Sequence, residues 1–126
     1  MRRAVFLDRD GTMIEERGYL DRLELVSPFS YTADAIRRLR GAGFAIVVVT
    51  NQAGIARGYF DEDFVRSTHA YLNSLLGDAA APDAYYFCPH HPEGVVDRYR
   101  VICRCRKSDS AASGVSRHHT CAPSVR

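Results

Sequence analysis

The sequence lacks any long hydrophobic run. Its longest apolar stretch, residues 44–49, is far shorter than the roughly 20 residues of a membrane-spanning helix. Only four apolar residues stand between the N-terminal arginines and Asp8, whereas the hydrophobic part of a signal peptide has roughly 7–15. We therefore expect a cytoplasmic protein with no membrane partner.

The sequence is also poor in net charge and in lysine. A formal net charge of +2 is too small to indicate binding to nucleic acid or to a charged membrane surface. A single lysine, Lys107, stands beside 16 arginines, which makes its position worth following. There are only four cysteines, and in a cytoplasmic protein closely spaced cysteines favour a metal site over disulfide bonds.

The composition predicts one globular domain, because 126 residues with 46% hydrophobic and 25% charged residues match ordinary domain statistics. Short apolar runs at residues 3–7, 44–49 and 84–87 predict strands. We expect the first two strands to be buried, and the second to be buried on both faces. Helical patterns between the runs complete a strand, helix, strand, helix, strand order. This order is typical of an α/β fold with a parallel sheet and helices on its faces.

Capping residues predict where the two helices begin and end. Thr32 is the expected N-cap of the first helix, and Gly41 or Gly43 is its expected end. The second helix is expected to start near Asp61 and to end at Gly77. Its apolar face should contain Phe64, Val65, Thr68, Leu72, Leu75 and Leu76, and we expect His69 at its surface.

Two carboxylates follow the first strand. Asp8 and Asp10 stand just past the strand, in a turn that continues with Gly11 and Thr12. One carboxylate can attack phosphorus, and a second can donate and then accept the proton that this reaction moves. A divalent cation would offset the repulsion between the carboxylates and a phosphate. The alternative is an ordinary Asp-Gly turn.

The second strand also ends in polar residues, Thr50, Asn51 and Gln52. Their hydroxyl and amide groups can bind phosphate oxygens without adding charge, although they could equally be a strand-end cap. Arg57, slightly further along this loop, can reach a phosphate or face solvent. Ligands bind parallel sheets at the carboxyl ends of the strands, so we expect these residues near Asp8 and Asp10.

A cluster of cysteine and histidine follows the third strand. The spacing of its members is that of a tetrahedral zinc site with three cysteines and one histidine, all four positions being filled by protein, which makes the zinc structural. His91 is an alternative to His90, and unconnected reduced thiols are an alternative to a metal site. Cys121 lies outside the pattern. The expected ligands are Cys88, His90, Cys103 and Cys105.

Arg106 and Lys107 directly follow the last expected zinc ligand, so zinc would fix where they point. A lysine beside an aspartate nucleophile neutralises charge in phosphoryl transfer, and arginine offers a forked phosphate contact. A solvated basic pair is the alternative.

Together these residues resemble the haloacid dehalogenase (HAD) superfamily of phosphotransferases. Phe6-Leu-Asp-Arg-Asp-Gly-Thr12 resembles its first motif, Thr50 its second and Lys107 its third. Two longer segments resemble the HAD phosphatases that act on the 7-phosphate of D-glycero-D-manno-heptose 1,7-bisphosphate. These segments are Thr50-Asn-Gln-Ala-Gly-Ile-Ala-Arg-Gly58 and Cys88-Pro-His-His-Pro-Glu-Gly94 through Cys103-Arg-Cys-Arg-Lys107.

The resemblance implies a Rossmann-like HAD fold, Mg²⁺ dependence, a structural zinc loop and a role in heptose synthesis for cell-surface glycans. Asp8 would be the nucleophile and Asp10 the general acid/base, while Thr50 and Lys107 would hold the transferring phosphoryl group. Asp8 and the backbone carbonyl of Asp10 would bind Mg²⁺. The residues expected to meet the phosphorylated sugar are Glu16, Arg17, Gly18, Tyr19, Asn51, Gln52, Ala53, Arg57 and Arg106.

A histidinol-phosphate phosphatase is the alternative within the superfamily, since it shares the aspartates and the zinc site. Its zinc loop is typically shorter and its second motif reads closer to Asn-Gln-Asp-Gly-Leu-Gly, whereas this sequence has Ala53 and Ile-Ala-Arg at 55–57. A zinc module that binds nucleic acid is a more distant alternative, which the small net charge disfavours.

The sequence departs from the family pattern after Lys107. We expect residues 1–107 to form an incomplete HAD domain and residues 108–126, which are poor in large aliphatics, to be a disordered tail. The later strand, helices and Gly-Asp motif of the family are not found, so we interpret the chain as truncated or frame-shifted. We expect low or absent turnover, or an inactive zinc-binding remnant. The family is expected to be monomeric, whereas this chain is expected to self-associate through the uncovered edge of its first strand.

Overall fold

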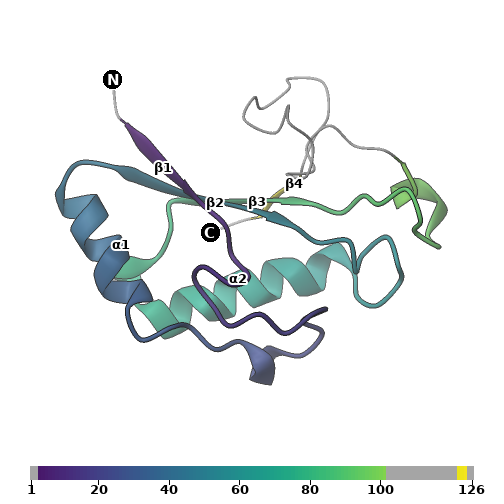
Figure 1. The fold of residues 1–126 in the computed structure, drawn as a ribbon, viewed down its shortest axis with the longest axis horizontal. Helices are drawn as coiled ribbons and strands as arrows, with labels where there is room; N and C mark the ends of the chain where they lie inside the picture. Colours follow the sequence, from purple (N-terminus) through teal and green to yellow (C-terminus); the bar gives the residue numbers. More distant parts are fainter. Residues whose placement is uncertain (1–2, 102–121, 125–126) are drawn as a thin grey trace.

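In the computed structural model, which describes residues 3–101 and 122–124, four strands form one sheet in the order β1-β2-β3-β4 (Figure 1). The first three strands are parallel to one another, and β4 is antiparallel to β3. The predicted α/β architecture with a parallel sheet is therefore confirmed. The strands are β1 (Ala4–Leu7), β2 (Ala45–Asn51), β3 (Ala84–Cys88) and β4 (Ala122–Ser124).

Two helices, α1 (Thr32–Gly41) and α2 (Glu62–Leu76), lie on the same side of the sheet (Figure 1). Short 3₁₀ turns occupy Leu23–Leu25, Asp78–Ala80 and Asp97–Tyr99. The longest helix among the described residues has 15 residues, and no helix there is long and apolar enough to span a membrane.

The expectation of fully buried strands is wrong for β1 and β2. In β2 the alternate residues Ile46 and Val48 are buried, while Val47 and Val49 between them are only half-buried. In β1, Phe6 is 62% exposed. The physical reason is the one-sided packing of the helices, together with the place of β1 at an edge of the described sheet.

The second helix begins and ends as its capping residues predict. Asp61 is the N-cap of α2, and its Oδ1 accepts a hydrogen bond from the backbone N–H of Phe64 at 2.8 Å. Gly77 ends the helix with a φ of +83°, a left-handed conformation that glycine adopts without steric cost. Leu75, expected on the apolar face, is 45% exposed.

The first helix begins differently from the prediction. Tyr31 is its N-cap and Thr32 is its first residue. The Thr32 hydroxyl donates to the carbonyl oxygen of Met13 at 2.7 Å, so it pins the preceding loop and does not cap the helix. The loop itself contributes to the core, since Met13, Ile14, Leu20 and Val26 are all buried.

The core has two parts. The larger cluster lies between the sheet and the two helices and includes Ile36, Ile46, Val48, Leu72 and Tyr85. The smaller cluster joins the loop after β2 to the segment after β3, and it contains Ile55, Ala56, Val65, Phe87 and Tyr99. The smaller cluster therefore holds in place the two loops that carry predicted site residues.

Of the predicted tail 108–126, the structure describes only Ala122–Ser124, which form β4 and pair with the free side of β3. An edge strand offers unpaired N–H and C=O groups, which gives a physical reason for this pairing. Four predicted site residues lie outside the described residues: Cys103, Cys105, Arg106 and Lys107.

Candidate active site

The three parallel strands all end in polar residues, which lie together at the carboxyl end of the sheet. Asp8 directly follows β1, Asn51 is the last residue of β2, and Cys88 is the last residue of β3. Asn51 and Cys88 are register partners, and the Gln52 N–H donates to the Cys88 carbonyl oxygen at 2.8 Å. The expectation that these residues lie at the same end of the sheet follows from the parallel register, and the structure agrees with it.

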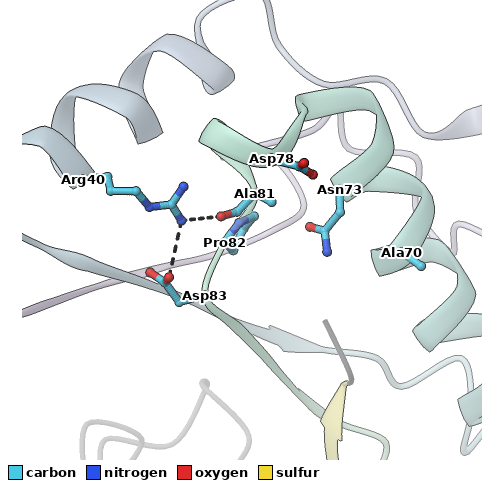
Figure 2. A pocket seen from close by; sticks show the side chains of 7 residues that line it. All are labelled: Arg40, Ala70, Asn73, Asp78, Ala81, Pro82 and Asp83. Carbon is cyan, nitrogen blue, oxygen red and sulfur yellow. Dashed lines mark hydrogen bonds and ion pairs between the residues drawn. The ribbon is translucent and has the colours of Figure 1, made fainter.

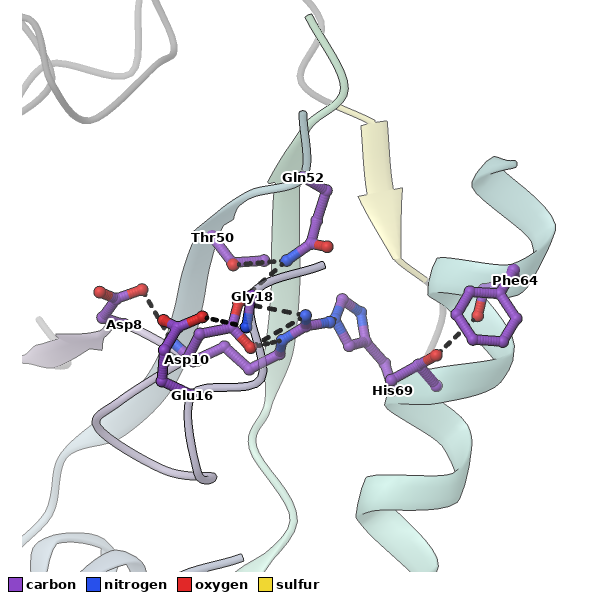
Figure 3. A network of polar contacts seen from close by, with 10 residues as sticks. Asp8, Asp10, Glu16, Gly18, Thr50, Gln52, Phe64 and His69 are labelled. Atoms are coloured by element: carbon purple, nitrogen blue, oxygen red, sulfur yellow. Dashed lines mark hydrogen bonds and ion pairs between the residues drawn. The ribbon is translucent and has the colours of Figure 1, made fainter. Parts of the chain in front are cut away.

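Asp10 is fixed by two side chains (Figure 3). The Nη2 group of Arg9 lies 3.1 Å from both carboxylate oxygens of Asp10, and Arg9 Nε donates to Oδ1 at 3.2 Å. The Gln52 side-chain amide donates to Asp10 Oδ2 at 3.2 Å and to the Thr50 hydroxyl oxygen at 2.9 Å. Gln52 thus links the polar end of β1 to the polar end of β2.

Asp8 has a different environment. Its side chain is exposed, and its Oδ1 accepts the Arg9 backbone N–H at 2.8 Å. This contact orients the carboxylate while leaving it accessible from solvent. The two predicted catalytic carboxylates therefore differ, one exposed and the other held by a guanidinium and an amide.

Two buried residues, Arg9 and His69, join this site, and neither was expected here from the sequence. His69 is not at the surface of α2 but fully buried, and Arg9 is only 2% exposed. Arg9 Nη1 lies 3.1 Å from His69 Nε2. The His69 ring stacks on Tyr85, with ring centroids 4.2 Å apart. Burial, and then the charge of Arg9, lower the pKa of His69 well below its usual 6.5. His69 is therefore neutral, and since arginine only donates, Nε2 is its acceptor and Nδ1 carries the proton.

The spacing of α2 could have revealed His69. Val65, Leu72 and Leu76 are buried, and His69 lies four residues after the first and three before the second, on the same helical face. Arg9 carries no such signal, because Asp-Arg-Asp before Gly11 is typical of a solvent-exposed turn.

The predicted substrate segment 16–19 forms an exposed loop. Glu16 Oε1 accepts the Gly18 N–H at 2.9 Å, and Arg17 forms an ion pair with Glu15. Tyr19 packs edge-on against Tyr59, with ring centroids 4.9 Å apart. These contacts lie within residues 15–19 and between this loop and the loop after β2.

The loop after β2 carries the other predicted substrate residues. Ala53 accepts the Arg57 backbone N–H at 3.1 Å in a tight turn. The Arg57 guanidinium lies 3.8 Å from a Glu93 carboxylate oxygen, and its Nε is buried with no hydrogen-bond partner among the described residues. The structure therefore turns Arg57 toward the segment after β3.

Two of the four predicted zinc ligands are described. Cys88 Sγ and His90 Nδ1 lie 3.8 Å apart. His91, the alternative ligand, accepts the Glu93 N–H on its Nδ1 at 3.0 Å. Within residues 3–101 and 122–124 no group of three or more potential metal ligands gathers, and the other two predicted ligands lie outside this part of the chain.

The described pockets lie away from Asp8 and Asp10. One, of about 430 Å³, is at the opposite end of the sheet, next to Asp83, which directly precedes β3 (Figure 2). Arg40 crosses it, donating to the carbonyl oxygens of Ala79 and Ala81 and pairing with Asp83 at 3.5 Å. Asp83 in turn accepts the Ile46 N–H at 2.7 Å. These contacts anchor α1 to the turn before β3. A second pocket, of about 370 Å³, lies between Phe60 and the segment after β3.

No family model matches the sequence. The chain is similar to the D-glycero-beta-D-manno-heptose-1,7-bisphosphate 7-phosphatase of Escherichia coli K12, with 44% identity over 105 residues, which cover 82% of this chain and 55% of that protein.

Two solved structures share the fold. The D,D-heptose 1,7-bisphosphate phosphatase of B. bronchiseptica, complexed with magnesium and phosphate, matches with a TM-score of 0.70 and 30% identity over 83% of this chain and 56% of that chain. A Mesorhizobium loti protein assigned as a HAD-like phosphatase matches with a TM-score of 0.77 and 33% identity over 84% of this chain and 51% of that chain. The chain thus spans a little over half the length of the relatives it matches.

Proposed function

We propose that this chain, which is similar to heptose 1,7-bisphosphate 7-phosphatases, is a HAD-type phosphatase that hydrolyses the 7-phosphate of such a sugar with Asp8 as the nucleophile. One observation carries the proposal. The exposed Asp8 stands beside Asp10, a second carboxylate that Arg9 and Gln52 hold in place. This pairing separates an accessible nucleophile from a positioned proton carrier.

The reaction has two steps. A carboxylate oxygen of Asp8 attacks phosphorus, the bond from phosphorus to the sugar oxygen breaks, and Asp10 gives its proton to the leaving oxygen. A water molecule then gives a proton to Asp10 and attacks the phosphorus of the aspartyl-phosphate. Inorganic phosphate leaves, and both carboxyl groups return to their starting states.

Thr50 supports this reaction from the end of β2. Its hydroxyl oxygen accepts from Gln52, so its own proton is available for donation to a phosphoryl oxygen. Lys107, outside the described residues, is the proposed cation that neutralises charge on the transferring group.

The carboxylate and carbonyl oxygens at the carboxyl end of the sheet suit Mg²⁺, which prefers oxygen ligands of these kinds. Asp8 and the backbone carbonyl of Asp10 would hold the ion, and one similar solved structure is complexed with magnesium and phosphate. When bound, Mg²⁺ supplies positive charge that reduces repulsion between the Asp8 carboxylate and the phosphate.

The sugar and its phosphates would be bound by the loops at the carboxyl end of the sheet. The loop 16–19 and the loop after β2 are held beside one another by the contact of Tyr19 with Tyr59. The buried part of Arg57 has a donor that a ligand oxygen could use. The proposed binding residues are Glu16, Arg17, Gly18, Tyr19, Asn51, Gln52, Ala53, Arg57 and Arg106.

A structural zinc ion remains part of the proposal. In a tetrahedral site with bonds of about 2.3 Å to sulfur and about 2.1 Å to nitrogen, the two ligand atoms lie about 3.6 Å apart. Cys88 Sγ and His90 Nδ1 are 3.8 Å apart, which fits this geometry. Cys103 and Cys105 would complete the site. A reduced thiolate site of this kind is compatible with the proposed cytoplasmic location.

Phosphorus NMR of the products tests the substrate. The chain, Mg²⁺ and D-glycero-D-manno-heptose 1,7-bisphosphate should yield inorganic phosphate and the sugar 1-phosphate. Histidinol phosphate, assayed in parallel, should release little phosphate. Loss of the 1-phosphate, or faster release from histidinol phosphate, would contradict the proposed substrate.

A further inference from the structure

Arg9 carries a charge into the interior, so its partners define what it does. An uncompensated buried charge is costly, and a guanidinium has five N–H donors to satisfy. Nε and Nη2 face Asp10, whereas Nη1 faces the opposite way, toward α2. The guanidinium therefore bridges the loop after β1 to a helix.

His69 is the partner of Arg9 Nη1 on α2, and its own position is fixed by its surroundings. It lies in the middle of α2, and its ring is stacked on Tyr85 with an interplanar angle of 13°. The Tyr85 hydroxyl donates at 2.8 Å to Asn73, one turn further along α2. Helix α2 and strand β3 together thus fix both the place and the plane of the imidazole.

We propose that His69 is a positioning residue for phosphoryl transfer, which sets the orientation of Asp10 through Arg9. The inference rests on the proposed function. Asp10 follows the end of β1 in an irregular loop, and a proton carrier acts only within hydrogen-bond reach of the atom it serves. The chain Asp10–Arg9–His69 ties that loop to the helix.

Three variants test this role. His69→Phe keeps an aromatic ring against Tyr85 but removes the acceptor for Arg9 Nη1, whereas His69→Gln keeps an acceptor. Leu72→Ala is the control for general destabilisation, because Leu72 is fully buried on the same helix and contacts the apolar core. Turnover is measured with the heptose bisphosphate and Mg²⁺ at a temperature where all variants are folded by circular dichroism.

For His69→Phe we expect kcat to fall by about tenfold or more while KM changes by less than about threefold, since general acid–base catalysis contributes about 100-fold or more. His69→Gln should recover most of the lost kcat, and Leu72→Ala should keep the wild-type kcat per folded molecule. A wild-type kcat in His69→Phe, or an equal loss in Leu72→Ala, would overturn the inference.

Nitrogen NMR of the Arg9 side chain provides a readout that does not need turnover. The Nη1 protons should exchange slowly with water in the wild type and in His69→Gln, and rapidly in His69→Phe. Unchanged exchange in His69→Phe would overturn the inference even if activity fell. Absence of turnover in the wild type, with the exchange difference present, would refute the proposed function and its catalytic use of His69, while showing that the contact itself is real.

Discussion

The Nη1 group of Arg9 and the Nε2 atom of His69 meet 3.1 Å apart in the buried layer between the sheet and α2. A permanently charged guanidinium and a fully buried imidazole are compatible only when the imidazole is neutral and accepts the hydrogen bond. This relationship has a consequence for stability as well as for the proposed catalysis.

The free energy of unfolding should decrease as the pH is lowered, because of His69. Its pKa is lowered in the folded chain, by burial and by Arg9, from the usual 6.5 of the unfolded chain. Below about pH 6.5 the unfolded chain therefore binds a proton that the folded chain does not, which favours unfolding. Compared with His69→Gln, the wild type should lose up to about 1.4 kcal/mol of unfolding free energy per pH unit below that value. Urea unfolding at about pH 7 and about pH 5 measures this difference, and parallel pH dependences of the two proteins would contradict it.

Gly94 should be intolerant of a side chain. A Cβ at this position would lie 2.7 Å from the Ala56 Cβ and 2.8 Å from the Ala56 carbonyl oxygen. That oxygen already accepts the N–H groups of Val95 and Val96, so it cannot move without breaking these bonds. Gly94→Ala should destabilise the chain by about 1–3 kcal/mol in thermal or urea unfolding.

Gly41 is the matched control for Gly94, because no atom lies within 4 Å of a Cβ added there. Gly41 is the last residue of α1, and Gly41→Ala should leave stability unchanged or raise it slightly. Equal effects of the two substitutions would show that the contact between the segment after β3 and Ala56 is not as tight as described.

The N-cap of α2 gives a third prediction. Asp61→Ala removes the acceptor for the Phe64 N–H and should cost about 1 kcal/mol of unfolding free energy. Asp63→Ala removes the same charge from the same helical turn, but Asp63 is 93% exposed and forms a 3.6 Å ion pair with Arg66. Its effect should be clearly smaller, and urea unfolding of both variants checks the order. An equal loss would mean that charge near the helix end, and not the cap hydrogen bond, stabilises α2.

Zinc content tests the proposed structural metal site. The purified chain should hold one zinc ion per molecule by elemental analysis, and Cys88→Ser should lose most of it because a thiolate ligand is removed. Cys121→Ser is the matched control, since Cys121 lies outside the predicted ligand set. Zinc absent from the wild type, or retained fully by Cys88→Ser, would contradict the site.

Local chemistry explains which features the sequence predicts. Asp61 and Gly77 bound α2 as expected, because a side-chain acceptor and a positive φ act within one helical turn. The convergence of Asp8, Thr50 and Cys88 also follows from the sequence, since parallel strands place their carboxyl ends at the same end of the sheet.

The features that the sequence did not predict depend on contacts distant in the chain. Nothing near Phe6 reveals that both helices pack on the other face of the sheet and leave it exposed. Arg9 is buried where its Nη1 meets His69 of α2, 60 residues away in the chain. Thr32 has a suitable side chain for a helix cap, but the Met13 carbonyl competes for it.

The central claim is that Asp8 is the nucleophile of a Mg²⁺-dependent phosphatase. The most direct measurement is phosphate release from D-glycero-D-manno-heptose 1,7-bisphosphate by the wild type and by Asp8→Asn, each with Mg²⁺ and with excess EDTA. We expect slow release by the wild type with Mg²⁺, in line with the low turnover expected from the sequence, and none above background in the other three samples. Release that persists in Asp8→Asn, or no release from folded wild type with Mg²⁺, would contradict it.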